Sequence, residues 1–165
     1  MSVKAGLPPI ARPDARLFLL GSLPGDASLA ARRYYAHPTN QFWRLLGSAI
    51  GEDLHGLSYE ARLDRLAERR IGLWDVIASA ARSGSLDQAI RLAEHNRVLQ
   101  LLHDFSDLRA IGFNGATAAA IGRKLVGEPP RGIALIDLPS SSAANTRPLA
   151  EKASAWAQLR KFVQP

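Results

Sequence analysis

Apolar residues along the chain fall into short continuous runs that alternate with segments of helical spacing. Short apolar runs bounded by turn residues indicate buried strands, which we predict at residues 16–20, 71–77, 109–113 and 132–137. Helical spacing, alanine-rich composition or a first-turn proline indicates helices, which we predict at residues 41–50, 58–70, 94–105, 115–125 and 149–163. Residues 1–14 are rich in Pro, Gly and Ala, and we predict an extended lead-in.

Strands that alternate with helices indicate a parallel sheet, because parallel neighbours need crossover connections. We therefore predict a single α/β domain over residues 1–165, with three layers (α/β/α) and a central, mostly parallel four-stranded sheet. Ligands of such open sheets bind beyond the carboxyl ends of the strands. The loops that should converge on one cleft are those after Leu20, Ile77, Phe113 and Asp137.

The segment between the first strand and the first helix, residues 21–40, is unusually long for a connection inside a compact domain. Loops of this length are either functional or disordered. Aromatic residues near its end, among them Tyr34 and Tyr35, favour a functional loop.

Charge and cysteine content narrow the possible functions. The chain has 21 Lys and Arg against 15 Asp and Glu, a net charge of +6, so nucleic acid is a natural partner, with an acidic membrane surface as the alternative. With no cysteine, the chain can form no disulfide, thiolate zinc site, iron–sulfur cluster or cysteine nucleophile. The four histidines are scattered and predict no metal site, and no other cofactor is expected. Since no apolar signal segment or membrane span is recognisable, we expect a cytoplasmic location and no membrane partner. We also expect a monomer.

Three segments carry a resemblance to a known family. They are GSLPG at 21–25 with YYAHPTNQFW at 34–43, GLWDVI at 72–77 with GSLD at 84–87, and LPSSSAAN at 138–145. In this order and separation they resemble the motifs of the uracil-DNA glycosylase superfamily, most closely those of hypoxanthine-DNA glycosylases, and are similar to mismatch-specific uracil-DNA glycosylases. The resemblance implies a monofunctional DNA glycosylase that flips a deaminated base, uracil or hypoxanthine, out of DNA and leaves an abasic site.

The same resemblance assigns the catalytic role to Asn40. In many members a carboxylate or amide two residues after the first glycine positions the attacking water, but Leu23 stands there in this chain. The asparagine of the His-Pro-x-Asn segment carries the role in hypoxanthine-DNA glycosylases, and it corresponds to Asn40. The alternative is that Asn40 only caps the helix that follows it. His37 is expected to hold the loop rather than to react.

Contacts to the flipped base are also implied by the resemblance, through Ser22, Leu23, Tyr35 and Asp75. Tyr35 would stack on the base, and Asp75 would accept a hydrogen bond from a ring N–H. The alternatives are that Tyr35 packs beneath the loop and that Asp75 only caps a turn.

Contacts to the DNA backbone and the vacated stack are implied for the later loops. Asn114 and Gly115 lie at a strand-to-helix junction that suits a phosphate, although a plain turn is equally compatible. The remaining predicted DNA contacts are Ser140, Ser141, Ser142, Ala144, Asn145 and Arg147.

Two departures from the family pattern leave alternatives open. Leu138 stands where several relatives have a histidine that stabilises the departing base, and Leu23 replaces a polar type. A DNA-damage binding module with weak or no catalysis is therefore an alternative. A small-molecule nucleotide-binding protein is a third possibility, but no phosphate-binding glycine motif supports it.

Overall fold

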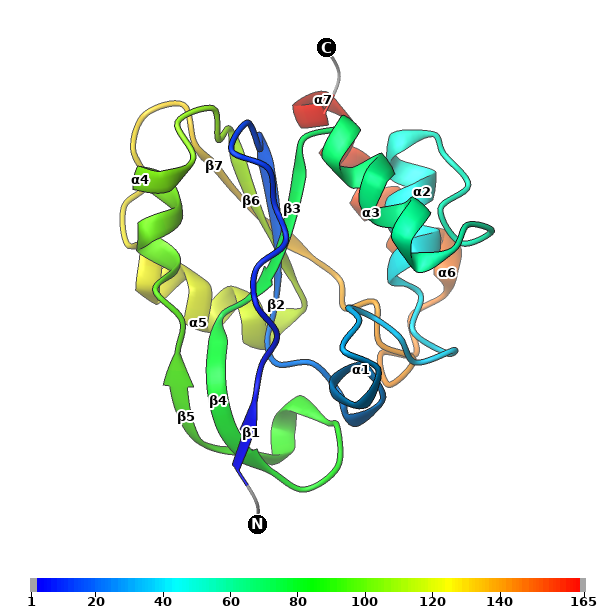
Figure 1. Cartoon of the computed structure of the whole chain (residues 1–165), viewed down its shortest axis with the longest axis vertical. Helices are drawn as coiled ribbons and strands as arrows, with labels where there is room; N and C mark the ends of the chain where they lie inside the picture. The colour runs from blue at the N-terminus through cyan, green and yellow to red at the C-terminus, as the bar shows by residue number, and fades with distance from the viewer. Residues whose placement is uncertain (1–2, 164–165) are drawn as a thin grey trace.

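The structure, a computed structural model, describes residues 3–163. Its centre is a four-stranded parallel sheet in the order β3-β2-β6-β7. The four strands are β2 (Leu17–Gly21), β3 (Ile71–Asp75), β6 (Ala110–Asn114) and β7 (Ala134–Leu138). Helices cover both faces of this sheet (Figure 1), so the predicted three-layer fold with a mostly parallel sheet is confirmed.

The strand β2 lies inside the sheet and is buried on both faces. Leu17 and Leu19 belong to one hydrophobic core, whereas Phe18 and Leu20 belong to the other, and all four are fully buried. A strand that is covered on both faces is apolar at every position rather than at alternate positions. This is why residues 16–20 are recognisable as a strand from the sequence alone.

One face of the sheet is covered by helices from the first and last parts of the chain. They are α2 (Phe42–Ile50), α3 (Tyr59–Glu68), α6 (Leu149–Trp156) and α7 (Arg160–Val163), with the 3-10 turn Ala157–Leu159 between the last two. The opposite face is covered by the 3-10 turn Val98–Gln100, α4 (Leu101–Asp104) and α5 (Ala116–Val126). The predicted helices at 41–50, 58–70, 115–125 and 149–163 are thus present in shortened or interrupted form.

A second, antiparallel sheet was not predicted. It has the order β1-β4-β5, formed by β1 (Val3–Ala5), β4 (Ile77–Arg82) and β5 (Ile90–His95). The prediction of a helix over residues 94–105 is wrong at its start, because β5 extends to His95 and the helical turns begin at Val98. Five of the six residues of β5 are exposed, so this strand carries no alternation of buried and exposed positions that a sequence pattern could reveal.

An extended lead-in was predicted for residues 1–14, of which residues 3–14 contain the short strand β1 and an isolated bridge, whereas residues 1–2 lie outside the described part of the chain. β1 pairs with β4, and Ile10 forms a bridge with Leu73. The predicted strand at 71–77 is divided, because β3 ends at Asp75 and β4 begins at Ile77 in the other sheet. The long loop at 21–40 contains a short helix, α1 (Asp26–Ala31).

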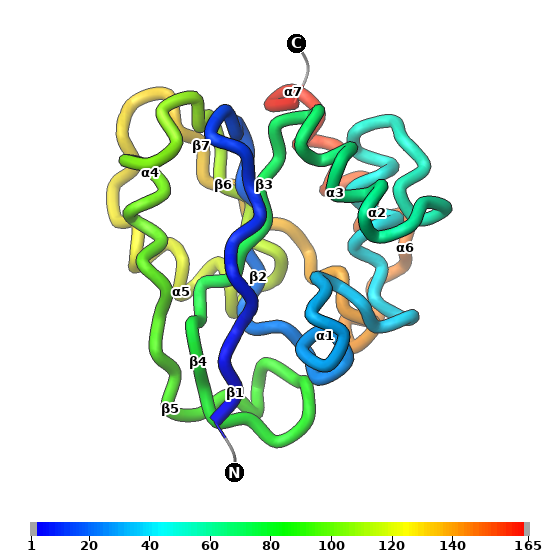
Figure 2. Tube along the Cα trace, in the orientation of Figure 1, coloured from blue at the N-terminus to red at the C-terminus, as the bar shows by residue number. Residues whose placement is uncertain are grey.

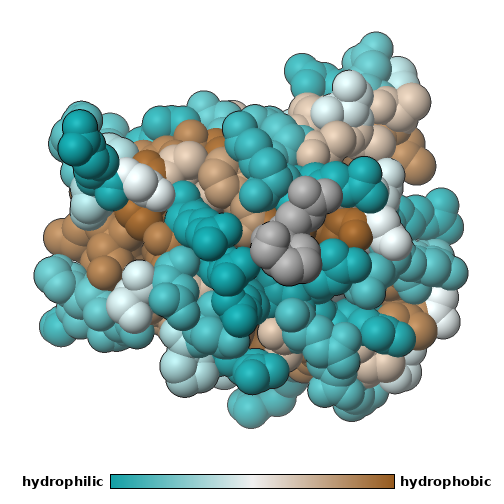
Figure 3. Space-filling view, turned by 90° about the horizontal axis from the view of Figure 1, so that it is seen from above, coloured by the Kyte–Doolittle hydropathy of each residue, from teal (hydrophilic) through white to brown (hydrophobic). Residues whose placement is uncertain are grey.

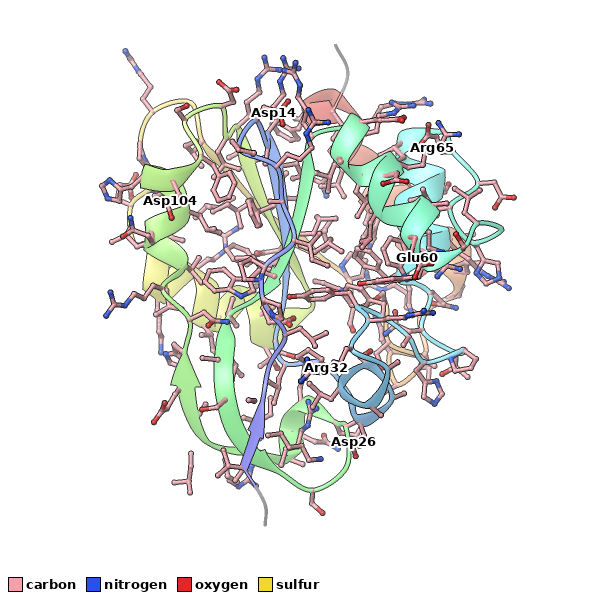
Figure 4. The ribbon with its side chains drawn as sticks, in the orientation of Figure 1. Asp14, Asp26, Arg32, Glu60, Arg65 and Asp104 are labelled. Atoms are coloured by element: carbon pink, nitrogen blue, oxygen red, sulfur yellow. The ribbon has the colours of Figure 1, made fainter. Side chains whose placement is uncertain are left out.

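The parallel strands all begin at one end of the molecule and end at the other. Asp14 lies at the end where they begin, whereas Asp26 and Arg32 lie beside α1 at the opposite end (Figure 4). Seen from the first end, hydrophilic side chains divide the apolar surface into separate areas (Figure 3). The loops that carry the predicted motifs lie at the second end, around α1 (Figure 2).

The close contact between α5 and β6 can be tested at Gly122. A Cβ atom added there would lie 2.2 Å from Cε1 of Phe113, whose ring is fully buried. Alanine in place of glycine inside a helix usually stabilises by about 1 kcal/mol, but forcing a buried ring to move costs about 1–3 kcal/mol. We expect Gly122→Ala to lower the free energy of unfolding, measured in urea. The exposed Ala120→Ser on the same helix is the control, and a Gly122→Ala protein of raised stability would contradict the packing.

Candidate active site

A cavity of about 710 Å³ opens beyond the carboxyl ends of the parallel strands. The loops after β2, β6 and β7 meet there, as predicted, together with Asp75 at the end of β3 and the connection between β4 and β5. Most of the predicted site residues line it, namely Ser22, Leu23, Tyr35, Asn40, Asp75, Asn114, Ser140, Ser141, Ser142, Ala144 and Asn145. Gly115 and Arg147 are not among the lining residues.

A chain of side-chain hydrogen bonds crosses one wall of this cavity. Asn114 Nδ2 donates to Ser141 Oγ (2.8 Å), and Ser141 Oγ donates in turn to Asn40 Oδ1 (2.8 Å). The backbone N–H of Ser141 donates to Asn114 Oδ1 (2.9 Å), so the two residues are bonded twice. The loop before α2 is thereby tied to the ends of β6 and β7, which lie far away along the chain.

The orientation of the Asn40 amide follows from its partners. Its Oδ1 accepts from Ser141 Oγ and also from the backbone N–H of Phe42 (3.0 Å), which can donate only to an oxygen. The N-cap residue of α2 is Gln41, so Asn40, one residue earlier, accepts from the first N–H of the helix and also forms part of the cavity wall. The amino group of Asn40 donates to no atom of the described residues, so it is the group that can bind water or a ligand in the cavity.

Tyr35 and Tyr34 have different surroundings. The ring of Tyr35 stacks on Phe42, with centroids 3.8 Å apart, and its hydroxyl accepts from Asn114 Nδ2 (3.3 Å). Burial, followed by the charge of Asp75, raises the pKa of Tyr35, so the phenol stays neutral. Tyr34 is 2 % exposed and donates to the backbone carbonyl of Pro8 (2.8 Å). Tyr34 is thus fixed beneath the loop, and both tyrosines are among the residues that line the cavity.

Asp75 is buried at the end of β3, with only 4 % of its surface exposed. Its Oδ2 atom has no hydrogen-bond partner among residues 3–163. Its Oδ1 atom and the Tyr35 hydroxyl fill the space beside Gly21, where a Cβ atom would lie 2.7 Å and 3.0 Å from them. Burial raises the pKa of Asp75 to about 7, with a further contribution from the charge of Asp87, against the lowering effect of Arg82. Any side chain larger than the hydrogen atom of Gly21 would therefore displace Asp75 or Tyr35.

The first wall of the cavity, the turn at residues 22–25, is held by two polar contacts from the second sheet. Arg82 is 1 % exposed and donates to the backbone carbonyls of Leu23, Pro24 and Gly84. Ser22 Oγ donates to Asp87 Oδ1 (2.5 Å). Leu23 is 6 % exposed and belongs to one of the two hydrophobic cores, so its side chain presents only apolar atoms to the cavity.

The second wall, the loop at residues 140–147, is held by a buried cation. Lys152 on α6 is 1 % exposed, and its Nζ donates to the backbone carbonyls of Asn145 (2.8 Å) and Ser142 (3.3 Å) and to Gln41 Oε1 (2.8 Å). Trp156 Nε1 donates to the carbonyl of Pro139 (2.9 Å) on the same loop. In Figure 2 this loop passes beside the segment that precedes α2, and Gln41 N donates to Ser141 O (2.9 Å) between them.

Several residues predicted to contact DNA already have partners in the protein. The hydroxyl of Ser141 is committed to Asn40, and the backbone N–H of Gly115 donates to the carbonyls of Phe113 and Leu138. Ser141 therefore positions Asn40. Within the loop, Ser140 Oγ and Ser142 Oγ accept from the backbone N–H groups of Ser142 (3.1 Å) and Ala144 (3.2 Å), which leaves the two hydroxyl protons for other acceptors.

The tip of the same loop is exposed. Ala144 and Arg147 are exposed, and Asn145 stabilises the loop by donating from Nδ2 to the carbonyl of Ser140 (3.2 Å) and accepting from the backbone N–H of Arg147 (3.2 Å). The loop therefore presents a small apolar side chain, Ala144, and a cation, Arg147, to solvent.

Sequence reasoning missed three residues that shape the site: Arg82, Asp87 and Lys152. Asp87 belongs to the recognised GSLD segment, but no role was inferred for it. Lys152 had a detectable signal, because it lies four residues before Trp156 and seven before Leu159, on the buried face of its helix. Arg82 had none, since the antiparallel sheet that places it was not predicted.

Between residues 3 and 163, no group of three or more histidine and carboxylate side chains has the arrangement of a metal site. Within the same residues, none of the helices has the length and apolar character required to cross a membrane.

Fold and cavity together define a three-layer α/β protein with a polar ligand site at the carboxyl end of a parallel sheet. A family model described as the uracil DNA glycosylase superfamily matches residues 8–160. A hypoxanthine DNA glycosylase of Methanosarcina barkeri (strain Fusaro) is 40% identical over 161 residues, covering 96% of this chain and 98% of the relative. A hypoxanthine DNA glycosylase of Methanosarcina acetivorans is 41% identical over 154 residues, covering 93% and 96%.

A solved structure agrees with these matches. The solution NMR structure of a Methanosarcina acetivorans protein, provisionally described as a uracil DNA glycosylase, superposes with a TM-score of 0.86 at 39% identity, covering 99% of this chain and all of that one. The chain therefore belongs to the uracil DNA glycosylase superfamily. The predicted enzyme class, a DNA glycosylase, is confirmed with it.

The role of Lys152 in the second wall can be tested with Lys152→Met, which keeps the side-chain volume but removes the donor. Three partly buried acceptors lose their partner, so we expect the free energy of unfolding to fall by about 1–3 kcal/mol. Amide hydrogen exchange of residues 142–145 should accelerate as well. Lys124→Met, at an exposed position of α5, is the control. Equal stability and equal exchange in the two variants would contradict this role of Lys152.

Proposed function

We propose that this protein removes deaminated bases from DNA, with hypoxanthine as the first substrate and uracil as the second. The observation that carries the proposal is the Asn40 amide, fixed by Ser141 and Phe42 so that its amino group is left for the cavity that Asp75 and Tyr35 also line. The names of the two Methanosarcina relatives support hypoxanthine. Uracil remains in the proposal because both bases have a ring N–H beside a carbonyl.

In the proposed reaction the damaged nucleotide leaves the duplex and its base enters the cavity. The face of Tyr35 that does not stack on Phe42 is the surface for stacking, which contributes about 1–3 kcal/mol per base. Asp75 accepts from the ring N–H, while Ser22 and Leu23 form the neighbouring edge of the pocket. These contacts hold the base against the strand ends.

The chemical step is a substitution at the sugar carbon by water. The amino group of Asn40 donates to the water oxygen, which leaves a lone pair directed at the sugar. The carbon–nitrogen bond breaks as the carbon–oxygen bond forms, the base departs with the bonding electrons, and the water proton is lost to solvent or to the base. Positive charge develops on the sugar and negative charge on the base, so hydrogen-bond donors near the base contribute as much as the water does.

Contacts to the DNA backbone are proposed for the rim of the cavity. The hydroxyl groups of Ser140 and Ser142 and the guanidinium of Arg147 are the donors available for flanking phosphates. Ala144 and Asn145 would occupy the space left in the base stack. Asn114 and Gly115 form the junction before α5, whose first N–H groups lack intrahelical partners and suit a phosphate.

A cleavage assay tests the function. Labelled duplexes that carry hypoxanthine, uracil, xanthine or thymine opposite each normal base are incubated with the protein and then treated with alkali. We expect strand breaks at hypoxanthine and, more slowly, at uracil, because both present the same N–H and carbonyl edge to Asp75. Tight binding without breaks would instead support a damage-binding module, which the apolar Leu23 and Leu138 favour. Neither binding nor cleavage would refute both.

The role of Asn40 is tested with two substitutions under single-turnover conditions. Asn40→Asp keeps the oxygen that accepts from Phe42 and Ser141 but removes the amino donor, and Asn40→Ala removes both. We expect each to slow cleavage by at least about tenfold, or about 1.4 kcal/mol.

A helix N-cap residue that does not line the cavity provides the control for Asn40. Ser58 caps α3 by accepting from Ala61 N (3.2 Å), and Ser58→Ala should cost about 1 kcal/mol of stability without changing the rate. If Asn40→Asp cleaves as fast as the unaltered protein, Asn40 acts only as a cap.

A further inference from the structure

Resting on the proposed function, we propose that Asp75 meets the flipped base as an undissociated acid, a state that its burial favours and that the charge of Asp87, on the same cavity, favours further. The consequence is that base excision slows as the pH rises above neutrality. The role of Asp75 thereby changes from a simple acceptor to a group that both donates and accepts.

The geometry leaves the Asp75 carboxyl without the partners that an ionised carboxylate needs. Oδ2 is buried and accepts from no group of the described residues. The nearest amide donor, Asn96 Nδ2, bonds to the backbone carbonyl of Asp75 (2.8 Å) and not to its side chain. A buried charge that lacks both a counterion and hydrogen bonds is strongly disfavoured, so the neutral acid is the form that this position accommodates.

Two charged groups near Asp75 act on its pKa in opposite directions. Asp87, across the cavity wall, is a like charge and raises the pKa of Asp75. Arg82 lowers it, but its guanidinium is bonded to the carbonyls of Leu23, Pro24 and Gly84 and forms no ion pair with Asp75. Tyr34 and Tyr35 have raised pKa values and stay neutral, so neither supplies a charge.

The base edge explains why the neutral form would be useful. Hypoxanthine and uracil each present a ring N–H, which donates, directly beside a carbonyl oxygen, which accepts. Because Oδ2 is buried, Oδ1 is the oxygen that can meet this edge, and as the hydroxyl of the undissociated acid it can both accept from the ring N–H and donate to the carbonyl oxygen. In the carboxylate Oδ1 can only accept, so it would face the carbonyl oxygen of the base without a proton between them. Loss of the proton therefore exchanges one hydrogen bond for a repulsion.

The sign of the pH dependence follows from the protonation state. The pKa of Asp75 lies at about 7, so the acid predominates below neutrality and the carboxylate above it. We expect the single-turnover rate on a hypoxanthine duplex to fall roughly fivefold between pH 7 and pH 8, the factor by which the protonated fraction falls. Measurements from about pH 5.5 to about pH 8, at constant ionic strength, stay below the range in which hypoxanthine loses its own ring proton.

Two matched variants separate the carboxyl groups. Asp75→Asn holds one donor and one acceptor at every pH, so its rate, whatever its level, should vary by less than about twofold over this range. Asp87→Asn keeps an oxygen for the Ser22 hydroxyl but removes the charge. The midpoint of the fall should therefore move to lower pH.

Two further variants serve as controls. Asp64→Asn removes one negative charge from an exposed position of α3 and should leave the profile unchanged. His37 is a second ionisable residue that lines the cavity. If Asp75 is the source of the pH dependence, His37→Gln should keep the same midpoint.

A spectroscopic measurement tests the protonation of Asp75 without relying on catalysis. At 17.9 kDa the protein suits NMR, and the carboxyl carbon of Asp75 should titrate near neutral pH, and at lower pH in Asp87→Asn. Titration in the ordinary aspartate range, or an unmoved midpoint in Asp87→Asn, would overturn the proposal. So would a rate that is flat or rises with pH, or a fall that persists in Asp75→Asn. Cleavage of neither base at any pH refutes the proposed function instead, and the NMR midpoints still decide the state of Asp75.

Discussion

The hydroxyl group of Ser141 is the contact on which the arrangement of the site depends. It accepts from Asn114 at the end of β6 and donates to Asn40 before α2, while its backbone groups bond to Asn114 and Gln41. Asn40 and Ser141 are 101 positions apart in the chain. Hydrogen bonds arranged in a series strengthen one another in a low-dielectric interior. The loss of one member therefore affects the orientation of the others, and the Asn40 amide is correctly placed only when the ends of β6 and β7 are.

Two buried cations fix the cavity walls, and the choice of their partners determines the electrostatics of the cavity. Arg82 and Lys152 bond mainly to backbone carbonyls, and none of their hydrogen bonds within residues 3–163 goes to a carboxylate. Both have lowered pKa values, chiefly because of burial. The carboxyl groups of Asp75 and Asp87 consequently face the cavity without an ion-pair partner among the same residues. The two cations therefore hold the loops in place, whereas the two carboxyl groups are left for the chemistry of the pocket.

The sequence predicted those parts of the fold that are buried on a regular pattern. Strand β2 was recognisable because both of its faces are covered, and α2 because its apolar positions recur at helical spacing. The antiparallel sheet was not, since β5 is almost entirely exposed and β4 is rich in alanine and serine. These strands are stabilised by pairing with one another, which is a long-range property that local patterns do not carry.

The residues of the candidate site were likewise predictable only in part. Residues such as Asn40 and Asp75 came from motifs whose order along the chain carries information, and the structure places them around one cavity. Ser141 was assigned to phosphate contact because a serine-rich turn suggests hydrogen bonding but does not reveal the partner. Arg82 and Lys152 were missed because a charged residue is read as exposed unless tertiary structure shows otherwise.

Leucine stands at two positions where the family resemblance implies polar side chains. Other residues must therefore orient the water and stabilise the departing base. Leu23 and Leu138 are 6 % and 3 % exposed and belong to the two hydrophobic cores, so neither can orient water or donate to the departing base. Their burial tightens the ends of β2 and β7. The polar functions then fall to the Asn40 amide, in the loop before α2, and to the carboxyl group of Asp75, at the end of β3. If Asp75 carries a proton, the departing base gains a donor that Leu138 does not supply, and the loss of polar residues at one edge of the pocket is offset at another.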